Sequence, residues 1–429
     1  MIQYEKIIIV IDEPKRDLAP LLFLATKLVK KNYQVYLISF SQLSKIEKSF
    51  FKNSILIINY FRFNNLHFLI WIKIFCKTRI IVYDTEGVGS RDGYQVVRII
   101  KKYEYFHDII DQYWLWNNAI LNELKKFNFK NDIFFTVGNY RFSQHFLESR
   151  KINNDSKKQI LINTNFAFIS PKYSRGPQQE LKSAQSTSDP ATSEDLDHYF
   201  NVRKQFLDII KNIISYYSNE TFVLRAHPFE NNIFWTKNLS EFKNVIFRSD
   251  GDVIDELLIS KFVIHNNCST AVEALNLNVP SISFDWLFNS KFDPYFPRLA
   301  SIKCKNINEV FDNINEILSQ NFSEFKKIDK NLVNAHYKDT YSTNDIFDTC
   351  VNLISLIQIK VIKLKFGYFK YLFINILYKI ANLFFERKKN IYDKLLNQEK
   401  IMNEFNKMKN TECKLLVIND KVYSILNKN

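Results

Sequence analysis

The stretch TFVLRAHP (Thr221–Pro228) combines the two features that decide the fold: a short apolar run of strand type, and polar residues directly after it. A second stretch of the same design, FVIHNNCSTAVEA (Phe262–Ala274), follows farther along the chain. In an open α/β sheet, ligands bind at the carboxyl ends of the strands. We therefore expect one sheet edge to present an Arg, a His, amides, hydroxyls and a carboxylate, a set that suits a phosphorylated sugar ligand.

Apolar runs of strand type recur along the chain and alternate with helical patterns. In the first part, the expected strands are 7–11, 35–39, 55–60, 80–83 and 133–137. In the second part, they are 160–163, 221–224, 245–247, 262–264 and 281–284. Continuous β-branched runs that alternate with helices are typical of a parallel, doubly wound sheet. The sequence therefore predicts an α/β fold with two Rossmann-like domains facing a cleft, followed by a helical C-terminal tail.

The expected domain boundaries follow from changes in composition along the chain. The first domain spans residues 1–150 and the second spans 151–345. Within the second, the segment 170–197 is polar and rich in Ser, Gln and Asp, which is typical of a surface insertion. The tail, residues 346–429, has a helical pattern and is basic. Between 356 and 389 its lysines and arginines mix with bulky aromatic residues, so this part either lies on an anionic membrane or packs against the protein, and both interpretations stay open.

Composition and cysteine content narrow the class of protein. The chain has 429 residues, 46% of them hydrophobic, and a formal net charge of +14, which favours an anionic partner. Its five cysteines form no CxxC pair, so we expect neither a disulfide framework nor a zinc site, and we favour a reducing cytoplasm. We recognise no signal peptide and no uninterrupted apolar run long enough to span a bilayer. The charge is not concentrated in a recognition helix and no nucleic-acid motif occurs, so we expect no nucleic-acid partner.

The first candidate catalytic region is YDTEGVG (Tyr83–Gly89), which follows an expected buried strand. A general base for sugar transfer needs a carboxylate near the acceptor hydroxyl, with its pKa raised by partial burial. Asp84 and Glu86 are the candidates. The alternative is a carboxylate that only caps the following loop or helix.

The second candidate region binds the ligand's phosphate. Arg225 and His227 lie on the same face of an extended chain, and Pro228 disfavours helical geometry at His227. Together they can contact a phosphate, the arginine through two parallel hydrogen bonds. A structural histidine with satisfied hydrogen bonds is the competing interpretation.

The third region is the start of the helix expected after the second stretch. Asn266, Asn267, Ser269 and Thr270 lie at its beginning, where free backbone amides bind phosphate, and Glu273 lies about one turn inside, within reach of a ribose diol. Thr270 and Glu273 also have the spacing of a simple capping box, and both interpretations can hold together.

Several of these motifs, in this order, resemble a known family. TEG (Thr85–Gly87), RAHP (Arg225–Pro228) and HNNCSTAVEA (His265–Ala274) look like those of bacterial surface-carbohydrate biosynthesis proteins, which are similar to CMP-sugar glycosyltransferases such as sialyltransferases and Kdo transferases. The runs GNYRF (Gly138–Phe142) and NTNF (Asn163–Phe166) resemble the same family's linking region. The resemblance implies a GT-B fold and covers roughly residues 80–290.

The resemblance also implies roles for single residues. His227, Ser269 and Thr270 would contact the CMP phosphate, Glu273 the ribose, and Glu86 the transferred sugar. The family's acidic-acidic-Gly pattern would place an acid at position 85, where this chain has Thr85, so the identity of the catalytic carboxylate stays in doubt. No DxD motif occurs at an expected strand end; we therefore expect a metal-independent enzyme without a cofactor, in which cationic side chains and helix amides stabilise the departing CMP.

The leading interpretation is a glycosyltransferase that moves a nonulosonic acid or Kdo from a CMP-activated donor to a surface glycan, as in capsule or lipopolysaccharide synthesis. Its partners would be the nucleotide sugar and a lipid-linked or oligosaccharide acceptor, at the inner face of the plasma membrane. The alternatives are a CDP-polyol phosphotransferase of the teichoic-acid type, a catalytically degenerate relative, or a basic binding protein.

Overall fold

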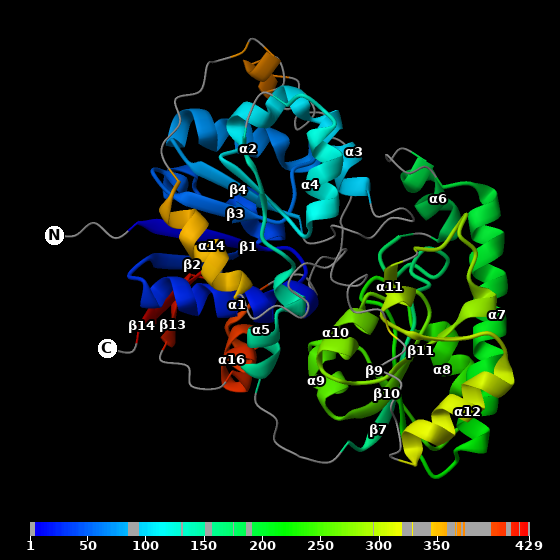
Figure 1. Ribbon diagram of the computed structural model, residues 1–429. Helices are drawn as coiled ribbons and strands as arrows, with labels where there is room; N and C mark the ends of the chain where they lie inside the picture. The colour runs from blue at the N-terminus through cyan, green and yellow to red at the C-terminus, as the bar shows by residue number, and fades with distance from the viewer. Residues whose placement is uncertain are drawn as a thin grey trace. The chain divides into compact units, whose positions relative to one another are not determined.

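The computed structural model places the chain in two compact units, each built on a mainly parallel sheet (Figure 1). It describes residues 5–84, 94–129, 132–150, 157–174, 176–185, 191–294, 296–319, 328, 345–357, 365, 367–369, 372–373, 396–408, 413–419 and 421–427. The N-terminal unit contains the described residues of 5–84, 96–150 and 345–427, and the C-terminal unit contains those of 94–95 and 157–328. The predicted α/β fold with two Rossmann-like units is therefore confirmed, whereas the predicted cleft between them stays a prediction.

The N-terminal unit contains an eight-stranded sheet in the order β13-β14-β2-β1-β3-β4-β5-β6. Its strands are β1 (Lys6–Ile11), β2 (Gln34–Ser39), β3 (Ile55–Ile58), β4 (Arg79–Tyr83), β5 (Gln112–Leu115), β6 (Phe134–Thr136), β13 (Cys413–Asn419) and β14 (Val422–Asn427). Strands β1 to β6 pair in parallel. Residues 7–11 of β1 are at most 1% exposed, which requires cover on both faces of the sheet and explains their uninterrupted run of Ile and Val.

Helices accompany these strands, and several of them begin at residues whose side chains satisfy free backbone amides. They are α1 (Pro14–Lys30), α2 (Phe63–Cys76), α3 (Gln95–Lys102), α4 (Asn118–Lys125), α5 (Gln144–Glu148), α14 (Ile346–Ser355) and α16 (Gln398–Lys407). Glu13 caps α1 by accepting a hydrogen bond from the Lys15 backbone, and Pro14 follows at the first position, where no amide is needed. Asn117 caps α4 in the same way through Ile120.

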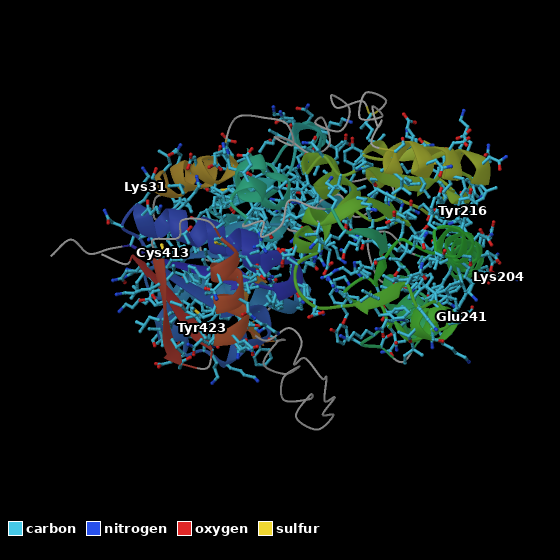
Figure 2. All side chains as sticks on the ribbon, turned by 90° about the horizontal axis from the view of Figure 1, so that it is seen from below. Lys31, Lys204, Tyr216, Glu241, Cys413 and Tyr423 are labelled. Carbon is cyan, nitrogen blue, oxygen red and sulfur yellow. The ribbon has the colours of Figure 1, made fainter. Side chains whose placement is uncertain are left out.

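The C-terminal segment belongs to the N-terminal unit and ends in a β-hairpin. The sequence pattern predicts helix throughout residues 346–429; α14 and α16 are helices, but the prediction is wrong for β13 and β14. β14 pairs antiparallel with β2 and thereby covers a strand that would otherwise be an open edge. Figure 2 shows Cys413 and Tyr423 on this hairpin, and both side chains are buried. A short apolar run does not distinguish helix from strand, because its pairing partner is hundreds of residues away in the chain.

The C-terminal unit is built on a six-stranded parallel sheet in the order β12-β11-β10-β7-β8-β9. Its strands are β7 (Gln159–Asn163), β8 (Phe222–Arg225), β9 (Val245–Arg248), β10 (Ser260–His265), β11 (Ser281–Phe284) and β12 (Ile302–Cys304). Its helices are α6 (Pro177–Gln185), α7 (Ser193–Tyr216), α8 (Ile233–Leu239), α9 (Val253–Leu258), α10 (Thr270–Asn276), α11 (Phe296–Leu299) and α12 (Ile307–Leu318).

Alternating residues of these strands pack into two separate cores, one on each face of the sheet. Ile160 and Ile162 of β7 pack with α7 and α12, whereas Leu161 packs with α9 and α10. This is the doubly wound arrangement that the apolar runs predict.

The polar segment 170–197 contains helix α6 and the start of α7 among its described residues. α7 begins inside this polar segment because Thr192 and Asp195 form a capping box: the Asp195 carboxylate accepts from the Thr192 backbone amide at 2.7 Å.

Candidate functional site

The strand order of the C-terminal unit creates a point at which the connections change direction. From β7, the chain continues through β8 to β9 on one side and then through β10 to β11 and β12 on the other. In such sheets, ligands bind beside the carboxyl ends of the two central strands. Here these are β7 and β10, and we call this edge the C-terminal switch edge: residues 163–166, 225–230 and 265–273. It contains every predicted ligand-binding residue. Asn163, the last residue of β7, pairs with His265 of β10 and with Arg225 of β8.

Arg225 lies at the predicted strand end, but its guanidinium contacts the protein itself. Nη1 donates to the Asp250 carbonyl at 2.5 Å, and Nη2 donates to the Gly251 carbonyl. The side chain is buried, and Gly251 has a positive φ of 70°, which suits a tight loop. In this structure, Arg225 therefore anchors the loop after β9; the predicted phosphate contact would have to compete with these carbonyls.

His227 lies in a turn after β8 and is half-buried. Its Nδ1 accepts a hydrogen bond from the Phe229 backbone amide at 3.3 Å, and its carbonyl accepts from the Glu230 amide at 2.8 Å. Because Nδ1 is an acceptor, the neutral imidazole carries its proton on Nε2. This tautomer can donate to an anionic oxygen, as the predicted phosphate contact requires.

His265 is a second histidine of the edge, and it has a structural role. It is 1% exposed; Nδ1 accepts from the Cys268 amide at 3.2 Å, and Nε2 lies 2.8 Å from Ser301 Oγ. Burial lowers the pKa of His265 to about 4, so the ring is neutral at pH 7. The bond to Cys268 shapes the following turn, in which Asn267 adopts a positive φ of 47°.

Two buried side-chain amide atoms at this edge have no hydrogen-bond partner among the residues that the structure describes. They are Asn163 Oδ1 and Asn266 Nδ2, on side chains 3% and 6% exposed. Buried polar atoms without partners are rare and are costly to keep. Nearby, Asn165 Nδ2 donates to the Asn267 carbonyl at 3.2 Å and ties the turn after β10 to the loop after β7. The edge thus retains unused hydrogen-bonding capacity next to a fixed framework.

The start of α10 differs from the predicted capping box. Ser269 is the N-cap, is exposed and makes no side-chain capping bond. Thr270 is buried with its Oγ1 3.0 Å from Cys268 Sγ, and Glu273 is 3% exposed. Ser269 is therefore the most accessible predicted hydroxyl.

Sequence reasoning missed Glu230, which is 4% exposed and lies three residues after His227. Its carboxylate accepts from Thr164 Oγ1 at 2.8 Å, from the Phe166 amide at 2.9 Å and from Trp235 Nε1 at 2.6 Å. It thereby joins the loops after β7 and β8. The only sequence signal is an acid shortly after the His-Pro pair.

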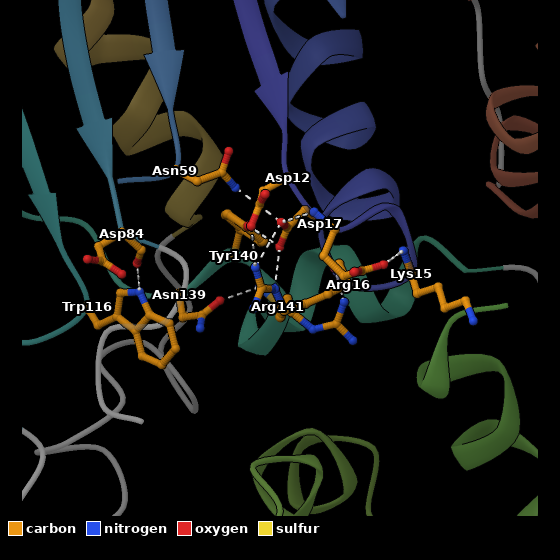
Figure 3. A network of polar contacts seen from close by, with 11 residues as sticks. Asp12, Lys15, Arg16, Asp17, Asn59, Asp84, Trp116, Asn139, Tyr140 and Arg141 are labelled. Atoms are coloured by element: carbon orange, nitrogen blue, oxygen red, sulfur yellow. Dashed lines mark hydrogen bonds and ion pairs between the residues drawn. The ribbon is translucent and has the colours of Figure 1, made fainter. Parts of the chain in front are cut away.

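The N-terminal unit has its own switch edge between β1 and β3, where a polar network surrounds Asp17 (Figure 3). Asp17 is fully buried and accepts from Arg16 Nε at 2.7 Å, Asn59 Nδ2 at 3.1 Å and Tyr140 Oη at 3.2 Å, as well as from the Glu13 amide. Burial, and then the charge of Asp17, raise the pKa of Tyr140 well above its usual value. We call these residues the Asp17 network. Sequence reasoning missed it, although charged residues do follow the first strand directly.

Of the two predicted catalytic carboxylates, the structure describes one. Glu86 and Thr85 lie outside the described residues. Asp84 follows β4, is 3% exposed, and its carbonyl accepts from Trp116 Nε1 at 2.6 Å (Figure 3). Burial and then the Asp84 charge raise the pKa of Tyr113, whose hydroxyl oxygen has no hydrogen-bond partner.

The described residues contain neither a candidate metal site nor a candidate membrane-spanning helix. In that part of the chain, no group of three or more His, Cys, Asp or Glu residues is placed to hold a metal ion, and metal independence stays a prediction. None of the helices described here has the length and apolar character that crossing a bilayer demands.

Similarity to known proteins is found among solved structures, not among protein families or curated sequences. No protein-family model matches the chain, and no curated protein sequence matches it significantly. Among solved structures, a UDP-N-acetylglucosamine 2-epimerase is similar at a TM-score of 0.51 and 12% identity, over 85% of this chain and all of that one. The UDP-GlcNAc 2-epimerase of Methanocaldococcus jannaschii gives a TM-score of 0.49 and 14% identity, over 82% of this chain and 99% of that one. At this identity the similarity shows the fold alone: two Rossmann-like units, as in GT-B proteins.

Proposed function

We propose that the chain is a GT-B enzyme that processes a nucleotide sugar, and that it transfers a nonulosonic acid or Kdo from a CMP-activated donor to a surface glycan. The observation that supports this most is the C-terminal switch edge. There, a neutral Nε2–H imidazole at His227, the exposed hydroxyl of Ser269 and two amide atoms without partners among the described residues, Asn163 Oδ1 and Asn266 Nδ2, share one sheet edge. His227, Ser269 and Asn266 Nδ2 are neutral donors that can bind a phosphate ester, while Asn163 Oδ1 can accept a hydrogen bond from a hydroxyl or amino group of the ligand. The net charge of +14 attracts such an anionic ligand.

In this proposal His227, Ser269 and Thr270 bind the CMP phosphate and Glu273 binds the ribose. Asn267 shapes the turn through its backbone, and Arg225 holds the loop after β9. Glu86 acts as the general base on the acceptor, with Asp84 as the alternative. A lipid-linked or oligosaccharide acceptor is the expected second substrate.

The competing candidate comes from the solved structures, because the similar protein is named for UDP-N-acetylglucosamine. A UDP-sugar epimerase would use the same edge for a different nucleotide. The choice between uridine and cytidine is therefore the first question for experiment.

Thermal unfolding against a panel of nucleotides answers it. CMP should raise the melting temperature more than UMP, UDP or ADP does, because ligand bound only to the folded state stabilises it. His227→Ala should abolish the rise, and the matched control His198→Ala, on α7 of the same unit, should retain it. Equal shifts with all nucleotides would argue against a CMP donor, and a shift with UDP alone, together with a configurational change at C2 of UDP-GlcNAc, would establish the epimerase.

The peripheral position at the inner membrane rests on residues 356–389, most of which lie outside the described residues. Truncation near Leu356 would also remove β13 and β14, so substitution is the cleaner test. Phe369 and Phe373 are 46% and 61% exposed. If this segment binds anionic vesicles, replacing both by Glu should weaken co-sedimentation at least tenfold, since each buried aromatic side chain contributes about 1.5–3 kcal/mol. Unchanged co-sedimentation would instead favour the alternative that this segment packs against the rest of the protein.

A further inference from the structure

The turn that carries His227 is held by a buried carboxylate. Glu230 lies at the end of the segment 227–230, and its side chain reaches across to the loop after β7. Oε2 accepts from Thr164 Oγ1 and from the Phe166 amide, and Oε1 accepts from Trp235 Nε1. Among the described residues, the three donors to this carboxylate are neutral. Such an arrangement costs free energy, because burial disfavours the charge and raises the pKa of Glu230.

Backbone bonds within residues 227–230 also fix the position of the His227 imidazole. The Glu230 amide donates to the His227 carbonyl at 2.8 Å, which closes the turn, and the Phe229 amide donates to Nδ1 at 3.3 Å. A second layer of backbone bonds supports the turn: the Lys172 amide donates to the Phe229 carbonyl at 2.8 Å, and the Asn231 amide donates to the Ser170 carbonyl at 2.7 Å. If the turn moved away from the β7 loop, the Phe229 amide would leave Nδ1.

We propose that Glu230 is a positioning residue for His227: its carboxylate holds the turn against residues 164–166, so that the Phe229 amide stays on Nδ1 and the imidazole presents an N–H at Nε2 to an anionic ligand. The consequence for binding rests on the proposed function, whereas the consequence for the tautomer does not. His227 is then a hydrogen-bond donor in the resting enzyme and does not act as a base through Nε2.

The test is ¹⁵N NMR of the full-length chain at pH 8, with the His227 imidazole assigned by its loss in His227→Gln. The wild-type ring should show a protonated Nε2 and an unprotonated Nδ1. In Glu230→Gln one of the two acceptor oxygens becomes an NH2 group, which must face either Trp235 Nε1 or the donors of Thr164 and Phe166. The turn then loses part of its support, so the ring should become a mixture of tautomers. The affinity for CMP should fall at least tenfold.

Two controls separate positioning from general loss of stability. Glu241→Gln changes an exposed glutamate that pairs with Lys211 at 3.1 Å, and it should leave both the tautomer and the CMP affinity unchanged (Figure 2 labels Glu241). Thr164→Val keeps the shape of the side chain at position 164 and leaves the Glu230 carboxylate in place, but it removes one hydrogen-bond donor to that carboxylate. It should produce a smaller tautomer shift and about a threefold loss of affinity, and it gives a result even if Glu230→Gln does not fold.

A wild-type ring protonated on Nδ1 would overturn the inference. So would an unchanged tautomer in Glu230→Gln or, should that variant not fold, in Thr164→Val. If the tautomer shifts as expected but CMP binds neither protein, the positioning role stands and the proposed nucleotide is wrong.

Discussion

The two switch edges occupy the same place in their sheets but differ in how their polar groups are used. At the N-terminal edge, the Asp17 carboxylate receives hydrogen bonds from Arg16, Asn59 and Tyr140, so the network is internally paired except for Asn59 Oδ1. At the C-terminal edge the groups are mostly neutral, and two buried amide atoms have no partner within the described part of the chain. A paired ionic network resists a ligand, because the ligand must displace bonds already made, whereas unpaired amides gain from one.

Topology gives each sheet a place suited to a ligand, and the pairing of the side chains at that place determines how favourable binding there can be. The N-terminal edge holds its own unit together, and the C-terminal edge is the better candidate for nucleotide binding. Substitutions at the two edges should therefore differ in whether they affect stability or ligand affinity.

The largest effect is expected from Asp17→Ala. It leaves Arg16 and Tyr140 without their buried acceptor, which should cost about 3–5 kcal/mol. Hydrogen exchange read separately on β1 and β7 checks it: protection should collapse in β1 and stay in β7. Asp208→Ala, at an exposed position of α7, should change neither strand. An equal loss of protection from hydrogen exchange in β1 and β7 would contradict the local role of the Asp17 network.

The C-terminal edge should lose stability in acid because His265 is buried in its neutral form. Its pKa is about 4 in the folded protein against an ordinary value of 6.5, so the unfolded chain takes up the proton first. The stabilisation is present above pH 6.5 and is lost as the pH falls towards 4, by about 3 kcal/mol. Urea unfolding of the wild type and of His265→Gln across this range measures it. Equal pH dependence in the two proteins would remove His265 as the cause.

The smallest effect, and the sharpest comparison, comes from one asparagine at each edge. Asn59→Ala removes a hydrogen bond to a buried carboxylate and should destabilise the protein by about 1.5–3 kcal/mol. Asn163→Ala removes an acceptor atom that has no partner, so its stability should change by less than about 1 kcal/mol, while nucleotide affinity falls. Urea unfolding and CMP titration of both variants test this. Similar losses of stability would show that the edges do not differ as described.

Part of the candidate site could be predicted from residue order alone. Buried strands are recognisable in the sequence as runs of Ile and Val, and the residues that follow them, such as His227 and Ser269, must lie at the sheet edge. The sequence also places Arg225 at a strand end but does not show that the carbonyls of Asp250 and Gly251 lie beside its guanidinium. The phosphate contact of Arg225 stays a prediction. Glu230 was missed because its partners, Thr164 and Trp235, reach it only through the fold.

The sequence by itself determined the two doubly wound units and the residues at the carboxyl ends of their strands, because strand period and burial are local properties of the chain. Only the tertiary structure decided that the last strands complete the first sheet, that Asp17 is saturated while Asn163 is not, and which nitrogen of His227 carries the proton. Those outcomes depend on hydrogen bonds between residues far apart in sequence, and no local pattern encodes which donor meets which acceptor.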